Sequence, residues 1–270
     1  TPKAQAGNPT PRLFRLKRDQ AVINRMGFNN DGLDSFVEGL QCYKHSAIIG
    51  SNIGKNKTTD DAVADFVSGL EAVYPYTDYV TVNVSSPNTQ GLRAMQKKEQ
   101  LSQLLSALQD TKASLQQRHQ KSVPLLLKIA PDLDEQGLED VAQVAVEMAI
   151  DGLVVSNTTI KRPRTLKSKM HGEQGGLSGA PLFESSTQAL ASMYRLTQGS
   201  IPIVGVGGIA SAEDAYVKIT AGASLVQLYT ALVYRGFQLV QEIVDGLPEL
   251  LARDGFSHVS EAIGSRSQEF

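Results

Sequence analysis

The sequence has little cysteine, no large excess of charge of one sign and no long apolar runs. Cys42 is the only cysteine, so no intramolecular disulfide can form and the chain fits a reducing compartment. The four histidines lack partners at metal-ligand spacing, so we expect no metal site. The formal net charge of −2 gives no electrostatic footprint for nucleic acid. No apolar stretch reaches the roughly 18 residues that a membrane span requires.

Short β-branched segments alternate with longer amphipathic segments through most of the chain. The strand candidates are nearly continuous in apolar residues, which is typical of parallel strands buried on both faces. Strand–helix alternation over 270 residues predicts an α/β fold, a (β/α)8 barrel of the TIM type, as one domain over residues 1–270. We expect strands at 47–52, 79–84, 124–130, 152–157, 202–207 and 224–229. We expect helices at 34–45, with Cys42 packed inside the protein, and at 60–74, 98–119, 137–149, 184–198 and 212–222.

Six strands are two fewer than a closed barrel of this type contains. Residues 1–16 are loop-like, rich in proline, and end in a short alternating segment at 12–16. We therefore expect the six to be strands three to eight, with two further strands and an N-terminal helical segment ahead of Thr1. An open six-stranded sheet is the alternative topology.

Polar side chains end four of the predicted strands. Asn52, Asn83 and Asn157 close three of them, and Lys128 follows three leucines in another. The carboxyl ends of parallel barrel strands share one rim, where such folds build active sites. Three amides and a lysine on that rim predict a planar polar ligand. The alternatives are ordinary turn-forming asparagines and an ion pair between Lys128 and Asp132.

Glycines and hydroxyl groups follow the last two strands. Gly207-Gly208 ends one, Tyr229-Thr230 ends the other, and residues 175–182 offer further backbone donors beside a mobile loop. Glycine lets backbone N–H groups approach a ligand, and barrels often hold a phosphate after their last two strands. A phosphate beside a planar polar site predicts FMN, with Lys128 stabilising the negative charge that accumulates on reduction. A tight turn alone, or a phosphate-binding isomerase without flavin, is the alternative.

Eight segments resemble motifs of the class 2 dihydroorotate dehydrogenase family, in family order and over essentially the whole chain. They are INRMGFNN, GSNIGKNKT, VNVSSPNTQGLR, LLKIAPD, VVSNTT, GGLSGAPL, PIVGVGGI and AGASLVQLYTAL. The resemblance implies an FMN-binding catalytic domain that oxidises (S)-dihydroorotate to orotate in pyrimidine (UMP) biosynthesis, with a membrane quinone as electron acceptor. It also implies two preceding strands, one bearing an active-site Lys, and a preceding membrane-associating segment. We therefore expect residues 1–270 alone not to fold into a soluble, flavin-loaded enzyme; a non-functional fragment is a further alternative.

The resemblance assigns residue roles as well. Ser86 would be the general base, where class 1 relatives carry Cys; a turn-forming serine before Pro87 is the alternative. A Ser hydroxyl is a poor base unless its surroundings pass the proton onward. The implied flavin-ring residues are Asn52, Asn83, Lys128 and Ser156, and the implied phosphate residues are Ser178, Gly179, Gly207, Gly208, Tyr229 and Thr230. The implied substrate residues are Asn24, Phe28, Asn83, Asn88, Asn157 and Thr158, and the implied quinone residues are Arg15 and Tyr229.

The implied partners are dihydroorotate, orotate and a quinone, with no nucleic acid. We expect a monomer that is peripherally attached to the cytoplasmic side of a bacterial inner membrane. The mitochondrial inner membrane is the alternative location.

Overall fold

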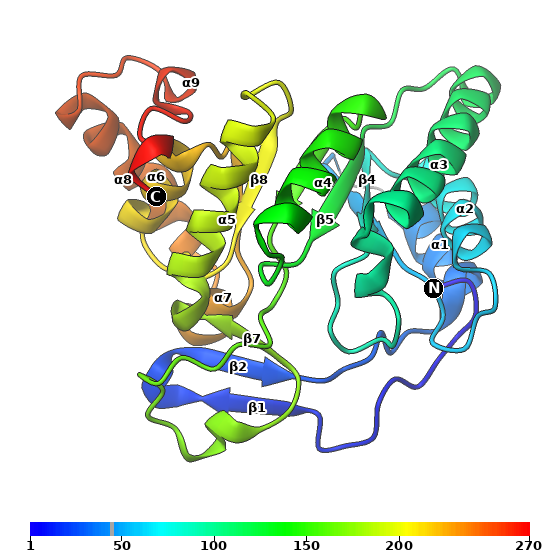
Figure 1. Cartoon of the computed structure of the whole chain (residues 1–270), viewed down its shortest axis with the longest axis horizontal. Helices are drawn as coiled ribbons and strands as arrows, with labels where there is room; N and C mark the ends of the chain where they lie inside the picture. Colours follow the sequence, from blue (N-terminus) through cyan, green and yellow to red (C-terminus); the bar gives the residue numbers. More distant parts are fainter. Residues whose placement is uncertain (44–45) are drawn as a thin grey trace.

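Six parallel strands form the main sheet of the computed structural model, which describes residues 1–43 and 46–270 (Figure 1). They lie in the order β3-β4-β5-β6-β8-β9, and each pairs in parallel with its neighbour. All six predicted strands are confirmed in their predicted order. Their bounds are β3 Gly50–Ile53, β4 Tyr79–Asn83, β5 Leu125–Ile129, β6 Gly152–Val155, β8 Ile203–Val206 and β9 Leu225–Gln227.

Helices cover one face of this sheet and bury its apolar side chains. Leu125, Leu127 and Ile129 of β5 are fully buried in a core that also contains Phe66 and Leu104 from two of these helices. Side chains alternate along a strand, so Leu126 and Lys128 face the opposite, inner side. The helices are α1 Gly32–Cys42, α2 Ala62–Val73, α3 Lys98–His119, α4 Glu135–Glu147, α5 Phe183–Leu196, α6 Ala212–Ala221, α7 Thr230–Arg235, α8 Gln238–Arg253 and α9 Val259–Ala262.

The predicted helices are confirmed at α1 to α6, and two details differ. The helix expected at 34–45 ends at Cys42, and Lys44 and His45 lie outside the described residues. Cys42 is exposed, so the expectation that it packs inside the protein is wrong. It occupies the last position of α1, of whose residues only Gly32 is buried. A pattern of apolar spacing does not show that a helix lies loosely on the surface.

The six strands curl as in a TIM barrel without closing it. Within residues 1–43 and 46–270, β3 pairs only with β4 and β9 only with β8. The two end strands are correspondingly open to solvent, and Leu225 of β9 is 66% exposed. The TIM-type prediction is therefore confirmed in sheet order, direction and curvature, over an arc of six strands.

A small antiparallel sheet covers the carboxyl ends of the main strands (Figure 1). It consists of β1 Leu13–Leu16, β2 Ala21–Asn24 and β7 Gly176–Gly179. The alternating segment at 12–16 corresponds to β1, whereas β2 and β7 were not predicted. No strand was predicted within residues 175–182, which are rich in glycine, a residue that is depleted in strands. Pairing with β2, over 150 residues earlier in the chain, orders this segment through tertiary contacts that local sequence does not encode.

Candidate active site

One cavity of about 430 Å³ opens where β5, β6, β8 and β9 end beneath the small sheet. Its volume lies in the range of small-molecule and cofactor sites. Residues from both sheets line it, so the fold brings together positions spread over 200 residues of sequence. The predicted site residues among its lining are Asn24, Lys128, Ser156, Asn157, Thr158, Ser178, Gly179, Gly207, Gly208, Tyr229 and Thr230.

Lys128 brings a cation to this cavity without a protein partner. Its ammonium group makes no ion pair or hydrogen bond with any described residue. Burial disfavours the charged form and lowers the pKa of Lys128. The alternative ion pair with Asp132 is not formed, because Asp132 pairs with Arg93 at 2.7 Å. A desolvated lysine without a counter-ion attracts an anionic or electron-rich ligand.

Backbone donors dominate the end of the cavity near β8 and β9. The N–H groups of Gly207, Gly208, Tyr229 and Thr230 have no hydrogen-bond acceptor among the described residues. Unsatisfied backbone donors gathered at one place suit an anion such as phosphate. The Thr230 hydroxyl donates to Ser178 Oγ at 2.8 Å and so joins the end of β9 to β7.

Packing against α5 also requires glycine at position 208. Its φ is +78°, in the region that favours glycine. A Cβ at this position would lie 2.7 Å from the backbone nitrogen of Phe183, the first residue of α5. A side chain here would therefore collide with α5 whether or not a ligand is bound, and a substitution of Gly208 does not isolate phosphate binding.

Side-chain amides dominate the other end of the site, near β4 and β6. Asn83 accepts from the Ser85 hydroxyl at 2.9 Å and donates to Asn52 at 3.2 Å. Asn157 donates to Ser85 Oγ at 3.0 Å and to Asn83 Oδ1 at 3.4 Å. These four polar side chains satisfy one another, and Asn83 and Ser85 are buried. A ligand that binds here must exchange some of these hydrogen bonds for its own.

A second group of polar side chains surrounds Ser86. Asn88 donates to the backbone oxygen of Asn24 at 3.0 Å and to its side-chain oxygen at 3.2 Å. Ser86 is 6% exposed, and its Oγ accepts from the backbone N–H of Asn88 at 3.3 Å. The turn-forming role is therefore present. Among described residues the hydroxyl has no acceptor for its own proton, so this contact leaves the proton available to a ligand or water.

Arg93 joins three of the loops that carry these residues. Its guanidinium donates to the backbone oxygen of Ser85 at 2.9 Å, to that of Thr158 at 2.8 Å and to Asp132 at 2.7 Å. Asp132 in turn accepts from the Thr159 hydroxyl. One planar group thus links the segments that follow β4, β5 and β6.

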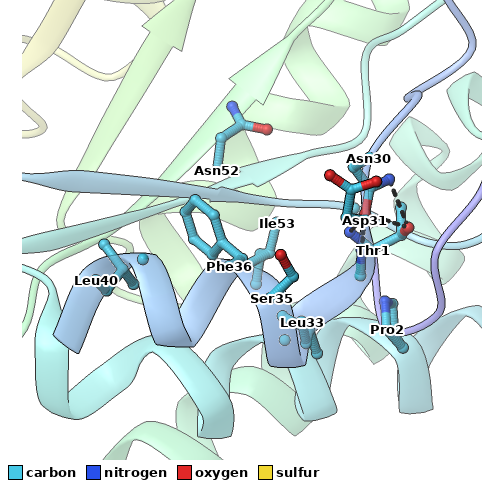
Figure 2. Close-up of a pocket in the computed structure, with 14 residues that line it drawn as sticks. Thr1, Pro2, Asn30, Asp31, Leu33, Ser35, Phe36, Leu40, Asn52 and Ile53 are labelled. Carbon is cyan, nitrogen blue, oxygen red and sulfur yellow. Dashed lines mark hydrogen bonds between the residues drawn. The ribbon is translucent and has the colours of Figure 1, made fainter. Parts of the chain in front are cut away.

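Six predicted site residues do not line the main cavity. Asn83 and Asn88 hydrogen-bond to the lining residues Asn157 and Asn24, and Ser86 bonds to Asn88. The other three are Asn52, Phe28 and Arg15. Asn52 lines a second cavity of about 460 Å³ between β3 and α1; Figure 2 shows its amide on the opposite side of the strand from Ile53. Phe28 packs against the main core, with its ring beside Gly54. Arg15 is exposed on β1.

The chain matches known proteins over nearly its whole length. The family model for dihydroorotate dehydrogenase matches residues 1–251. The chain belongs to the dihydroorotate dehydrogenase family. Its relatives include the dihydroorotate dehydrogenase (quinone) of Azorhizobium caulinodans, 51% identical over 98% of this chain and 75% of the relative. That of Parvibaculum lavamentivorans is 52% identical over 98% and 74% of the two chains.

Solved structures of the family superimpose closely on the chain. The crystal structure of the Eimeria tenella dihydroorotate dehydrogenase in complex with ferulenol has a TM-score of 0.94 and 41% identity, and covers 98% of this chain and 76% of that one. The ligand-free Eimeria tenella structure has a TM-score of 0.93 and 42% identity, over 98% and 79% of the two chains. Both the resemblance and the assignment as an oxidoreductase are therefore confirmed.

Sequence reasoning missed two charged residues that support the site. Arg93 stands at the end of the quoted motif VNVSSPNTQGLR, but nothing in its spacing indicates three backbone and side-chain partners. Lys218 is fully buried in α6, where its Nζ donates to Ser186 Oγ at 2.6 Å. A helical projection of α6 places Lys218 on the face that carries Ala215 and Ile219. This position on an apolar face could have indicated from sequence that Lys218 is buried.

Proposed function

We propose that this chain is the FMN-binding catalytic domain of a quinone-dependent dihydroorotate dehydrogenase, which oxidises (S)-dihydroorotate to orotate in pyrimidine biosynthesis. One observation supports this above all. A single cavity holds the unpaired cation of Lys128 and the free N–H groups of Gly207, Gly208, Tyr229 and Thr230. A phosphorylated, electron-accepting planar ligand matches both features.

The residues present fit FMN. The four free N–H groups would hold the phosphate, joined by the hydroxyls of Ser178 and Thr230 once these exchange their bonds to Val22 and to each other. Ser156 and Lys128 would lie beside the ring. When bound, FMN supplies the acceptor for the hydride that leaves the substrate. Lys128 stabilises negative charge at the ring edge, and burial strengthens that interaction because little water screens it.

The amide end of the site would bind the substrate. Asn24, Asn88, Asn157 and Thr158 present amide and hydroxyl groups that complement a carboxylate and ring amides. Asn83 connects to this group through Asn157, so it would help to orient the substrate from its buried position. Phe28 and Asn52 would act from the margin of the site.

Ser86 would take the C5 proton of the substrate. Among described residues no histidine or carboxylate hydrogen-bonds to it, so the proton must leave through a route other than a protein acid–base pair. Water admitted to the cavity is the natural acceptor.

The electron acceptor would be a quinone, as the names of the bacterial relatives state for those proteins. Tyr229 is 78% exposed at the mouth of the cavity, and Arg15 is exposed on the covering sheet. Both are open to a ligand that arrives from outside the protein. No described helix is long and apolar enough to cross a membrane. A peripheral position on the cytoplasmic face of a bacterial inner membrane would bring the exposed Tyr229 within reach of the quinone.

The visible spectrum of the purified full-length protein tests this proposal. Flavin absorption bands are expected, and the ligand released on denaturation should be FMN. A colourless protein with isomerase activity on a phosphorylated substrate would support the phosphate-binding isomerase instead.

A further inference from the structure

Lys218 is a buried cation outside the cavity that reaches the phosphate end through hydrogen bonds. Its Nζ donates to Ser186 Oγ at 2.6 Å and to the backbone oxygen of Phe183 at 3.3 Å. Ser186 Oγ lies 3.1 Å from the backbone oxygen of Gly207. The Phe183 oxygen, 3.0 Å from the same hydroxyl, already accepts from the lysine. The Thr187 hydroxyl also donates to the Phe183 oxygen, so donation by Ser186 to Gly207 leaves both backbone oxygens with a donor.

The peptide bond between Gly207 and Gly208 continues this chain of hydrogen bonds. The bond is trans, because the cis bonds of the described chain occur elsewhere. In a trans peptide the C=O and the N–H point in opposite directions. Ser186 holds the Gly207 oxygen toward α5, so the Gly208 N–H points away from α5, and Gly208 lines the cavity. Each hydrogen bond polarises the next, so a positive charge at Lys218 strengthens the last donor.

A second side chain of α6 fixes the other end of the same segment. Asp214 lies one turn before Lys218 and accepts from the backbone N–H of Ala210 at 2.9 Å. Thus Ser186 of α5, which Lys218 contacts, holds the segment at Gly207, and Asp214 of α6 holds it at Ala210. Burial lowers the pKa of Lys218 to about 7, and the charge of Asp214 opposes this shift. An anion at the end of the hydrogen-bond chain would favour the charged lysine.

We propose that Lys218 and Ser186 are positioning residues that make the cavity select a phosphorylated flavin over an unphosphorylated one. The charge of Lys218 polarises the Ser186 hydroxyl and, through it, the peptide between Gly207 and Gly208. The Gly208 N–H therefore becomes a stronger donor to the phosphate. This inference rests on the proposed function, since it assumes that FMN occupies the cavity.

Flavin affinities of four proteins test the proposal. Apoprotein from the wild-type holoenzyme and from Lys218→Met, Ser186→Ala and Thr187→Val is titrated with FMN and with riboflavin, and flavin fluorescence is followed. Thr187 is the matched control, because its hydroxyl also donates to the Phe183 oxygen, at 2.7 Å, without contact with Gly207. Methionine is unbranched and adapts to buried apolar sites, so the Lys218 variant retains packing.

We expect Lys218→Met and Ser186→Ala to weaken FMN binding about tenfold, as the loss of a charge-linked hydrogen bond would. Their affinity for riboflavin should change less than about twofold, and Thr187→Val should resemble the wild type. The proposal would be overturned if both variants kept the wild-type ratio of FMN affinity to riboflavin affinity, whether through equal losses or through no loss. A wild-type protein that binds neither flavin, or binds both equally, would instead contradict the proposed function.

Discussion

The two ends of the cavity achieve polarity in opposite ways. At the end near β8 and β9 the donors are backbone N–H groups of Gly207, Gly208, Tyr229 and Thr230, which have no acceptor among the described residues. At the amide end the polar groups are side chains that already bond to one another, such as Asn157 to Ser85 at 3.0 Å. A backbone site is preformed, whereas a side-chain network must rearrange when a ligand enters.

This difference fits a resident cofactor and an exchanging substrate. Preformed donors bind tightly because little conformational freedom is lost. Amides that return to their own partners after product leaves keep the empty substrate site satisfied. Changes at the amide end should therefore alter rates with little loss of flavin, and changes behind the phosphate end should alter flavin binding.

The largest expected effect is at Ser86. Ser86→Ala should retain FMN and slow flavin reduction by dihydroorotate about 10²–10⁴-fold, because a positioned base contributes that much. Anaerobic rapid mixing measures the rate, and Ser86→Cys, which keeps an ionisable group, should be faster than the alanine variant. A near-normal rate of reduction in Ser86→Ala would leave this serine only its turn-forming contact with Asn88.

The next effect is at Lys128, between the two ends. Lys128→Met should slow flavin reduction about 100-fold through lost charge stabilisation, with FMN still bound. The same change should raise the free energy of unfolding of the apoprotein by about 1 kcal/mol, because it removes a half-buried, desolvated cation that has no partner among the described residues. Lys121→Met is the control, since Lys121 bonds to Thr77 outside the cavity lining. An unchanged rate of flavin reduction in Lys128→Met would show that the flavin ring does not lie beside Lys128.

Lys218 makes the stability of the apoprotein depend on pH. Its pKa is about 7 in the folded state and about 10.5 when unfolded, so the unfolded chain binds the additional proton between these values. Stability therefore rises with pH in that window. From about pH 7 to about pH 9 the wild type should gain about 2 kcal/mol relative to Lys218→Met, as denaturant titrations would show. Parallel pH curves for the two proteins would mean that Lys218 keeps an ordinary pKa.

The smallest effect concerns Arg93 at the amide end. Arg93→Lys keeps the charge but cannot reach three acceptors, so the loops after β4 and β6 should lose alignment. We expect kcat to fall about tenfold and KM for dihydroorotate to rise, with unchanged FMN content. Arg266→Lys, which also alters an Arg–Asp pair, lies outside the cavity lining and should change neither. Reduced flavin content in Arg93→Lys alone would show that Arg93 supports the whole barrel rather than the substrate end.

The sequence predicted the individual parallel strands and helices better than the contacts between distant segments. Each parallel strand, such as 124–130, carries its own apolar run, so local pattern suffices to find it. The small sheet escaped prediction because Gly176 and Gly179 pair with β2 only after the chain has folded. Arg93 and Lys218 escaped for the same reason, since each takes its role from partners distant in sequence.

Anaerobic addition of dihydroorotate to the purified holoenzyme tests the two-ended site most directly. The account predicts that the visible absorption of the bound, oxidised flavin disappears and that one orotate forms for each flavin reduced. Flavin that stays oxidised in the presence of excess dihydroorotate, or flavin that is reduced without orotate formation, would contradict it.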